Sequence, residues 1–287
     1  MHEVLHVLGH AVLDSVKLLP FLFLTYLLME FLEHRAGERI ERAVARAGKA
    51  GPVIGGVLGL LPQCGFSAAI AGLFAGRVVT VGTVVAVFLA TSDEMIAVFL
   101  GKGMPWHVVP VTLAVKLVVA VLVGFLVDLL FRDRQDTPHV KDLCEAEGCH
   151  CEKGIWRSAL HHTLHIFLFV LIINVLLGAL FEVLSAERIA ILLNGVPVLG
   201  QTIAALIGLV PNCAASVAIA TLYASGAISA GSMIAGLLTG AGAGLLVLFR
   251  ANKHLRENLQ ITALLFVTAL VVGCLLDYTG LAVLIGL

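Results

Sequence analysis

The chain has 287 residues, of which 60% are hydrophobic and only 13% are charged, and its mean hydropathy is +1.04. Several apolar runs exceed the ~18 residues that mark a membrane span, which excludes an ordinary soluble domain and predicts an all-α polytopic membrane protein. The net charge is −1, and the sequence has no basic patch with interleaved aromatic residues, so nothing indicates nucleic-acid binding. The lipid bilayer is therefore the first partner that we expect.

The sequence repeats itself with a shift of 149 residues, the spacing from Cys64 to Cys213. The shift aligns the two halves without gaps over a long stretch and also pairs Asp128 with Asp277. Two similar halves with matching Pro- and Gly-interrupted segments are typical of many secondary transporters. We predict a first transmembrane repeat at 1–131, a cytoplasmic Cys/His-containing linker at 132–157 and a second transmembrane repeat at 158–287.

Each half is expected to contain the same series of helices. A long apolar helix comes first, at about 13–32 and 161–184, and is followed by a broken segment at 51–75 and 196–224. A third apolar segment covers about 79–100 and 227–249, and a final span covers about 108–131 and 259–285. The arms of each broken segment are shorter than the ~20 residues needed to cross a membrane, so each segment either re-enters or forms two short spans. Both readings give an odd number of crossings per half, which predicts two inverted-topology repeats.

The loop charges provide an independent test of this arrangement. The predicted topology places nearly all arginine and lysine residues of the loops on one side of the membrane, and only Lys102 and Arg188 on the other. By the positive-inside rule, the linker is cytoplasmic and both termini are outside. We expect a multi-pass protein of a bacterial-type cytoplasmic (inner) membrane.

A Pro-x-Cys sequence interrupts the broken segment of each half. Proline breaks a helix, and inverted halves would bring the two breaks together near the membrane midplane. Unwound backbone there must line a cavity or be buried, helix N-termini favour anions and polar ligands, and cysteine thiols suit soft metals. The alternative is that these residues only permit close helix packing. The residues expected to bind substrate are Pro62, Gln63, Cys64, Gly65, Ser67, Pro211, Asn212, Cys213 and Ser216.

A second candidate site lies in the third segment, where two adjacent carboxylates, Asp93 and Glu94, interrupt an apolar run. Charges inside a bilayer are costly and usually functional. Lys116, deep in the final span, is the natural counter-ion, and the second half has no charge at any of the three corresponding positions. We expect Ser92, Asp93, Glu94 and Lys116 to couple transport, and Asp93, Glu94, Cys64 and Cys213 to be the metal ligands. The alternative is a solvated loop with Lys116 snorkelling to the surface.

Two further groups of residues are candidates for metal binding. His2, His6, His10 and Asp14 recur every four residues, as do His161 and His165, which fits either a metal relay or polar residues at a membrane interface. The linker contains Cys144, Cys149, His150 and Cys151. These four residues could capture a soft metal in the cytoplasm, or they could belong to an incidental flexible loop.

The two-fold repeat, the Pro-x-Cys break in each copy and the Cys/His-rich linker resemble the ten-transmembrane heavy-metal exporters, which are labelled as arsenic efflux proteins or manganese transporters. The chain is also similar to organoarsenical permeases. The resemblance covers almost the whole chain and rests on Pro62, Cys64, Pro211, Cys213 and the acidic pair. It implies export of a metal or metalloid: Mn²⁺ would favour the oxygen ligands, and trivalent arsenic would favour the thiols.

These features together predict a secondary-active exporter of a heavy metal or metalloid that works by alternating access and is coupled to protons or another ion. No ATP-binding motif is present, we expect no cofactor, and a homo-oligomer is compatible with the sequence. One alternative is a carrier of a small anion or organic solute. A membrane-embedded thiol enzyme is a weaker alternative, because the sequence has no Cys-x-x-Cys pair, so we expect no enzymatic activity.

Overall fold

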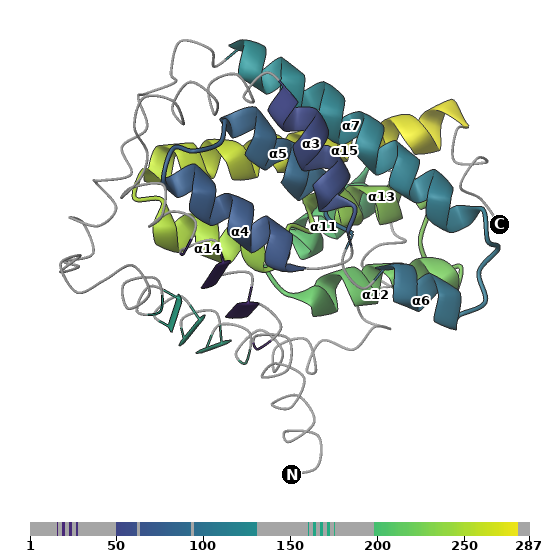
Figure 1. Ribbon diagram of the computed structural model, residues 1–287. Helices are drawn as coiled ribbons and strands as arrows, with labels where there is room; N and C mark the ends of the chain where they lie inside the picture. Colours follow the sequence, from purple (N-terminus) through teal and green to yellow (C-terminus); the bar gives the residue numbers. More distant parts are fainter. Residues whose placement is uncertain are drawn as a thin grey trace, which may run out of the picture.

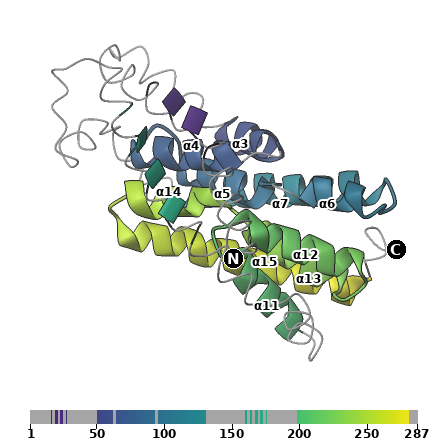
Figure 2. The same cartoon turned by 90° about the horizontal axis from the view of Figure 1, so that it is seen from below.

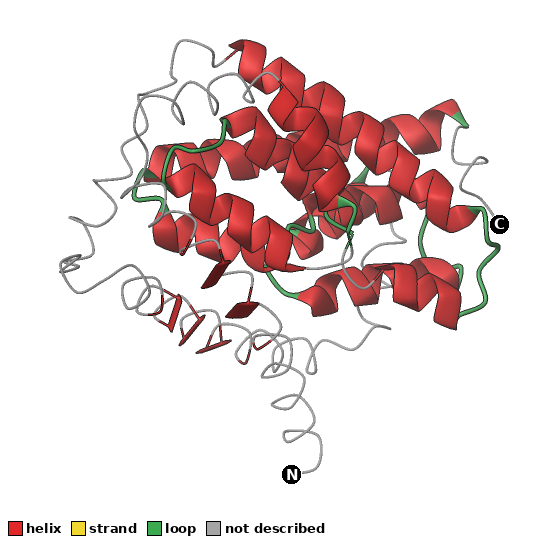
Figure 3. Cartoon of the chain, in the orientation of Figure 1, coloured by secondary structure: helices red, strands yellow, loops and turns green. Residues whose placement is uncertain are grey.

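The computed structural model describes residues 50–61, 64–92, 95–130 and 198–280, together with single helical positions within 16–27 and 160–175. Over these residues the chain consists of helices and loops (Figure 3). Most of the first helix expected in each half, the Cys/His linker and the histidines near residues 2–10 lie outside the described residues. The all-α class is confirmed for the part of the chain that the structure describes.

The 149-residue shift relates the helices of the two halves one to one. The first half contains α3 (Gly51–Gly59), α4 (Cys64–Ala75), α5 (Val81–Ala90), α6 (Met95–Gly101) and α7 (Val108–Leu130). The second half contains α11 (Leu199–Gly208), α12 (Cys213–Ala224), α13 (Ala230–Thr239), α14 (Ala243–Ala251) and α15 (Leu255–Thr279). The breaks expected at the Pro-x-Cys sequences are present, between α3 and α4 and between α11 and α12. The final spans are present as well, although α15 begins a turn earlier than expected.

The third segment of each half is interrupted, which the sequence analysis did not anticipate. In the first half α5 ends at Ala90, and the hydroxyl groups of Thr91 and Ser92 turn back to donate to the carbonyl oxygens of Val87 and Ala90. The second bond gives the carbonyl of Ala90 a donor at the helix end, whereas the carbonyl of Val87 also accepts from the amide of Thr91 at 2.9 Å. In the second half α13 ends at Thr239, and Gly242 adopts a φ of 53°, which an L side chain rarely tolerates.

Within the part of the chain that the structure describes, four segments are long and apolar enough to cross a membrane: Val81–Gly101, Val108–Leu130, Ala230–Ala251 and Leu255–Thr279. Two of them are the interrupted segments α5–α6 and α13–α14, which are mostly buried within the protein. The uninterrupted helices α7 and α15 are mostly unburied and expose large apolar side chains, among them Leu122, Leu129, Val267 and Leu275. An exposed apolar face on a spanning helix faces lipid, so the chain is a multi-pass membrane protein with α5 and α13 in its interior.

Each half contains a layer of three helices with the interrupted helix in the centre. In the first half α5 packs between α3 and α7, and in the second half α13 packs between α11 and α15. Glycine allows the closest approach: a Cβ at Gly82 would lie 2.1 Å from the carbonyl oxygen of Gly124, and one at Gly231 would lie 2.2 Å from that of Gly273. Small residues at a helix crossing are the usual means of close packing inside membranes.

Short helices of each half pack against short helices of the other half. The helix α4 packs along α14 of the other half, and α12 packs against α6 (Figure 1). Viewed at a right angle to this, the first half lies above the second in two layers (Figure 2). Because each interrupted segment begins in its own layer and ends against a helix of the opposite half, the helix breaks lie in the interior where the halves meet.

Candidate functional site

The polar centre of the molecule lies where α5 and α13 end. Most of the buried core is apolar, but a set of polar side chains with at most 6% exposure comes from the C-terminal ends of these two helices and from their neighbours α4, α7 and α12. The set comprises Ser67, Thr91, Ser92, Thr112, Lys116, Ser216 and Thr239. Polar groups in a membrane interior are costly unless they have partners or a function, so this is the candidate site.

Lys116 connects the two halves within this centre. Its side chain has 0% exposure, which rules out the alternative that it snorkels to the surface. The ammonium group donates to the carbonyl oxygen of Thr91 at 2.5 Å and to that of Leu237 at 2.6 Å. Thr91 is the C-cap of α5 in the first half, and Leu237 lies in the last turn of α13 in the second.

The two acceptor carbonyls lie at the negative ends of helices. The last turn of a helix leaves carbonyls without intrahelical donors and carries partial negative charge, which a nearby cation stabilises. At α13 the backbone turns away, since the amide of Ala241 donates to Thr239 at 2.8 Å instead of to the carbonyl of Leu237 four residues earlier. The helix breaks therefore create an acceptor for Lys116, and one ammonium group bonds to the ends of both central helices.

The serine residues expected in the substrate site both lie against the break between α13 and α14. A Cβ added at Gly244 would lie 2.7 Å from the Cβ of Ser67, and one added at Gly240 would lie 3.2 Å from the Oγ of Ser216. Ser67 is in the first turn of α4, and Ser216 is in the first turn of α12. The structure thus brings the first turns of both Cys-containing helices to one short glycine-rich segment.

Asn212 has a capping role in this structure. Its side-chain oxygen accepts a hydrogen bond from the amide of Ala214 at 2.8 Å, which makes it the N-cap of α12. N-cap asparagine is favourable because it satisfies one of the amide donors that a helix start leaves without partners. One of the amides expected to be available to a polar ligand is therefore already bonded, and the substrate role expected for Asn212 remains a prediction.

Several predicted site residues can be placed only along the chain. Cys64 and Cys213 are the first residues of α4 and α12, and Gly65 follows Cys64. Pro211 is partly buried at the end of the loop that leads to α12. Pro62, Gln63, Asp93, Glu94, Cys144, Cys149, His150 and Cys151 lie outside the described residues. Among the residues that the structure describes, no three His, Cys, Asp or Glu side chains gather as a metal-binding group, and this set leaves out most of the expected ligands.

The sequence analysis missed three features of the centre. It did not single out Thr112, whose buried hydroxyl lies one turn before Lys116 and has no hydrogen-bond partner among the described residues. It did not identify the carbonyl of Leu237 as a site group, because that contact joins residues 121 positions apart. Nor did it recognise the glycine-rich run at 240–244 as a helix break. The available signal was the unbroken alternation of Gly and Ala at these five positions.

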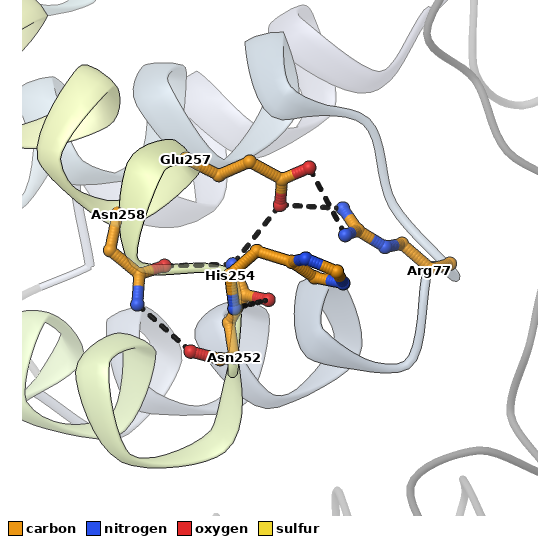
Figure 4. Close-up of polar contacts among 5 residues, drawn as sticks. All are labelled: Arg77, Asn252, His254, Glu257 and Asn258. Carbon is orange, nitrogen blue, oxygen red and sulfur yellow. Dashed lines mark hydrogen bonds and ion pairs between the residues drawn. The ribbon is translucent and has the colours of Figure 1, made fainter.

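A polar cluster ties the halves together at one end of the molecule, where the α4–α5 loop meets the start of α15 (Figure 4). Arg77 forms a two-pronged contact with Glu257, with nitrogen–oxygen distances of 2.9 and 3.1 Å. Asn252 donates to the same carboxylate at 3.2 Å and to the side chain of Asn258 at 2.7 Å, and Asn258 donates back to the backbone oxygen of Asn252. Paired guanidinium–carboxylate contacts are among the stronger hydrogen-bonded pairs.

This cluster has no counterpart at the positions that the repeat makes equivalent. The 149-residue shift places Gly226 opposite Arg77 and Val108 opposite Glu257, so the corresponding positions at the other end carry no charge. There α6 and α12 meet through a tilted contact between the rings of Phe99 and Tyr223, whose centroids are 6.0 Å apart. The two ends of the interface between the halves are therefore held together by different chemistry.

Comparison with known families decides what kind of protein this is. Residues 10–200, about two thirds of the chain, match the model of the family described as "Putative, 10TM heavy-metal exporter". The chain belongs to this family. The resemblance noted from the Pro-x-Cys repeats is confirmed, and the match to the heavy-metal exporter family includes α3 to α7 with Lys116. No match was found among curated proteins, and none among solved structures.

Proposed function

We propose that the protein is a secondary-active exporter of a heavy-metal or metalloid ion that works by alternating access between two inverted-topology repeats. Membership of the heavy-metal exporter family and the apolar, interrupted helices support this proposal. Discontinuous helices in both halves of a two-fold repeat are typical of secondary transporters whose substrate site lies between the repeats.

The observation that carries the proposal is the convergence of four helix breaks on the interface between the halves. Ser67 of α4 and Ser216 of α12 both adjoin the Gly240–Gly244 segment, and Lys116 bonds to the ends of α5 and α13 nearby. Irregular backbone inside a membrane is tolerated only where it is buried or lines a cavity. A rocking motion of one half against the other would open this centre to one side at a time.

Cys64 and Cys213 begin the two helices that reach this centre, which supports a thiophilic substrate such as trivalent arsenic or a soft divalent metal. Asp93 and Glu94 follow Thr91 and Ser92 in the chain, directly after the end of α5. We propose that one of these acids exchanges a proton, or another coupling cation, with the substrate. Lys116 would compete with these cations for the same oxygen-rich environment.

The difference between the two ends of the interface between the halves supports alternating access. The Arg77–Glu257 cluster holds one end of the interface together, and the other end lacks a charged pair at the equivalent positions. By the positive-inside pattern we propose that the Arg77 end faces the cytoplasm, with the central linker on the same side and both termini outside. On this proposal the structure corresponds to a state closed toward the cytoplasm.

Transport by purified protein in proteoliposomes tests the proposal. Vesicles loaded with Mn²⁺, Zn²⁺ or arsenite are diluted into buffers with and without a pH gradient, and substrate movement is followed by metal analysis. We expect gradient-dependent transport of at least one of these ions, abolished by Asp93→Asn or Glu94→Gln while the yield of protein is unchanged. Lys102→Gln, at an exposed position between α6 and α7, is the control for charge removal and should transport like the parent.

A carrier of small anions remains the second candidate, because α4 and α12 both begin at the polar centre and helix N-termini attract anions. Capping of α12 by Asn212 weighs against it, since the cap uses one of the amide donors that an anion would need. In the same vesicles, anion transport in the absence of any metal movement would replace the exporter proposal with this one.

A further inference from the structure

Two pairs of short helices join the halves, and the repeat makes these pairs equivalent: α4 with α14, and α12 with α6. The first turn of α4 adjoins Gly244 at the polar centre, and both helices of this pair end beside the Arg77–Glu257 cluster. The other pair also begins at the centre, and it ends at the contact of Phe99 with Tyr223. We call the pairs the Arg77 seam and the Phe99 seam. Each seam runs from the centre to one end of the molecule.

The two seams differ in how extensively they pack, although the rest of the repeat is packed alike. Within the halves, the contacts of α3–α5, α5–α7 and α4–α5 match those of α11–α13, α13–α15 and α12–α13 in extent. Between the halves, the contact of α4 with α14 is far more extensive than that of α12 with α6. Helix length does not account for the difference, because α14 has nine residues and α6 has seven. Among the described helix contacts, the seams therefore depart most from the two-fold repeat.

Side-chain burial shows the same difference between the seams. Leu245 and Val247 of α14 are buried. The 149-residue shift places Ile96 and Val98 of α6 opposite them, and both of these are partly exposed. Equivalent apolar side chains are thus covered in the Arg77 seam and partly uncovered in the Phe99 seam, which is the looser of the two.

One position limits how closely each seam can pack. A Cβ at Gly244 would lie 2.7 Å from the Cβ of Ser67, so glycine lets α14 approach the first turn of α4. In α6 the equivalent residue is Met95, which is fully buried. A methionine side chain is flexible and fills gaps of different shape. Met95 therefore does not force the looser packing of the Phe99 seam.

The bonds of Lys116 lie at the centre, where both seams begin. Its ammonium bonds to the carbonyl oxygens of Thr91 and Leu237, which belong to opposite halves. The three-helix layer of each half is closely packed and can move as one body. Rocking of the layers about an axis through the centre would open one seam, close the other and change the bonds at the axis least.

We infer that the two seams are the gates of the transport pathway and that they open in turn as the halves rock about the Lys116 bonds. The present conformation has the Arg77 seam closed and the Phe99 seam loosened. In the opposite state α12 packs along α6 as α4 now packs along α14, and the Arg77–Glu257 pair is broken. The role of the seams as gates rests on the proposed transport function, whereas their coupled movement can be measured without transport. Rocking of one repeat against the other is the usual form of alternating access in proteins with such repeats.

A wedge in one seam tests whether the two seams are coupled. Gly244→Ala places a methyl group 2.7 Å from Ser67 and 2.9 Å from the ring of Phe88, and should push α14 away from α4. Overpacking of this kind should raise the population of the opposite state roughly tenfold. In that state the Arg77 seam should be wider and the Phe99 seam narrower, each by on the order of 5 Å at its far end, about one helical turn.

Double electron–electron resonance on the full-length protein in nanodiscs measures both seams. Spin labels attached to genetically encoded ketone amino acids leave the native cysteines in place. One label pair, at Val78 and Phe249, reports on the far end of the Arg77 seam. The other pair, at the exposed positions Leu100 and Ser225, reports on the far end of the Phe99 seam.

Matched variants separate coupled movement from local distortion. Gly101→Ala adds the same methyl group where it meets nothing within 4 Å, and should leave both distances as in the parent. Leu248→Ala and Phe99→Ala remove equivalent buried side chains from the two seams. Leu248→Ala should favour the opposite state, and Phe99→Ala should favour the present one. This pair provides the test if Gly244→Ala does not fold.

Three results would overturn the inference. The first is a widened Arg77 seam with an unchanged or widened Phe99 seam in Gly244→Ala, because the wedge would then act locally. The second is a shift of Leu248→Ala and Phe99→Ala in the same direction, or in neither. The third is failure of all three variants to accumulate, because a protein with two stable packings tolerates weaker contacts in either seam. Coupled seams without ion transport in vesicles would refute the proposed function and leave the coupled movement standing, and transport with uncoupled seams would do the reverse.

Discussion

Two aspartate residues show how single side chains position the central helices. Asp128 accepts hydrogen bonds from the amide of Gly82 and the hydroxyl of Thr80, at 2.8 Å each, at the start of α5. Asp277 does the same for Gly231 and Ser229 at the start of α13, at 2.8 and 2.7 Å. The carboxylate satisfies helix-start donors and complements the positive end of the helix. Each central helix is thus fixed at one end by an acid on the final span of its own half.

We predict that Asp277→Ala lowers the stability of the protein more than Asp128→Ala does. Asp277 has an additional donor, the amide nitrogen of Gln201 at 2.5 Å, which would lose its acceptor as well. The loss of a cap together with buried donors left unpaired costs about 2 kcal/mol or more. Melting in detergent measures the difference, with the exposed neighbour substitution Tyr278→Phe as the control. Equal melting temperatures for Asp277→Ala and the control would contradict this role.

For single residues, the sequence predicted one member of the polar centre, Lys116, but not the groups that it contacts. The position of Lys116 in a long apolar run predicted a buried charge with a function, and its burial is confirmed. The acceptors could not be predicted, because Thr91 and Leu237 are brought to α7 by the packing of two halves. The pairing of Asp128 with Asp277 was visible in the repeat, but their capping role depends on helices that are 46 residues away.

At the scale of helices, proline marks two of the breaks in the sequence, whereas the other two have at most a weak signal, the alternation of Gly and Ala at 240–244. Proline removes an amide donor and clashes with the preceding turn, so helix breaks at Pro62 and Pro211 could be predicted from the sequence. The breaks after Ala90 and Thr239 contain no proline, and the segments around them are apolar enough to read as continuous spans. The bond from Lys116 to the carbonyl of Leu237 accompanies the second of these breaks and joins residues too far apart in the sequence to be anticipated.

Close glycine contacts make the central helix of each half sensitive to small changes. We predict that Gly82→Ala loses folded protein, because its Cβ would lie 2.1 Å from the carbonyl oxygen of Gly124 and 2.5 Å from the carboxyl group of Asp128. Overpacking typically costs 1–3 kcal/mol, and here it would also disturb the cap of α5. Gly101→Ala is the matched control, since its Cβ would meet nothing within 4 Å. The yield and melting temperature of detergent-solubilised protein measure both, and comparable values would refute the packing argument.

At the scale of the whole molecule, the repeat is nearly symmetric in its helices and asymmetric at its ends. The turn after α4 and the turn after α12 have the same backbone bonds, and both contain a residue in the left-handed conformation. In the second half this residue is Gly226, with φ 72°, which adopts it without strain. In the first half it is Arg77, with φ 57°, for which the conformation costs roughly 1–2 kcal/mol. The ion pair of Arg77 with Glu257 across the halves offsets part of this cost.

This difference yields a prediction with two substitutions at one position. Arg77→Ala keeps the strained backbone and loses the ion pair, whereas Arg77→Gly relieves the strain and loses the same pair. Arg77→Gly should therefore melt at a higher temperature than Arg77→Ala, because a left-handed turn after a helix favours glycine. Both variants should loosen the contact between the halves at this end. A partly exposed pair contributes at most about 1 kcal/mol, so the population of the opened state should rise by up to roughly fivefold.

Amide hydrogen exchange of the full-length protein measures that opening directly. We expect faster exchange in both Arg77 variants at the two loops that the pair joins, near residues 76–80 and 252–258, and unchanged exchange in the α6–α7 loop at the other end. Lys102→Ala, which removes a charge from that other loop, is the control and should alter neither of the joined loops. The exchanged pair Arg77→Glu with Glu257→Arg should recover part of the protection. If both Arg77 variants exchange like the Lys102 control, the ion pair does not hold the halves together, and the strained arginine has no role in closing this end.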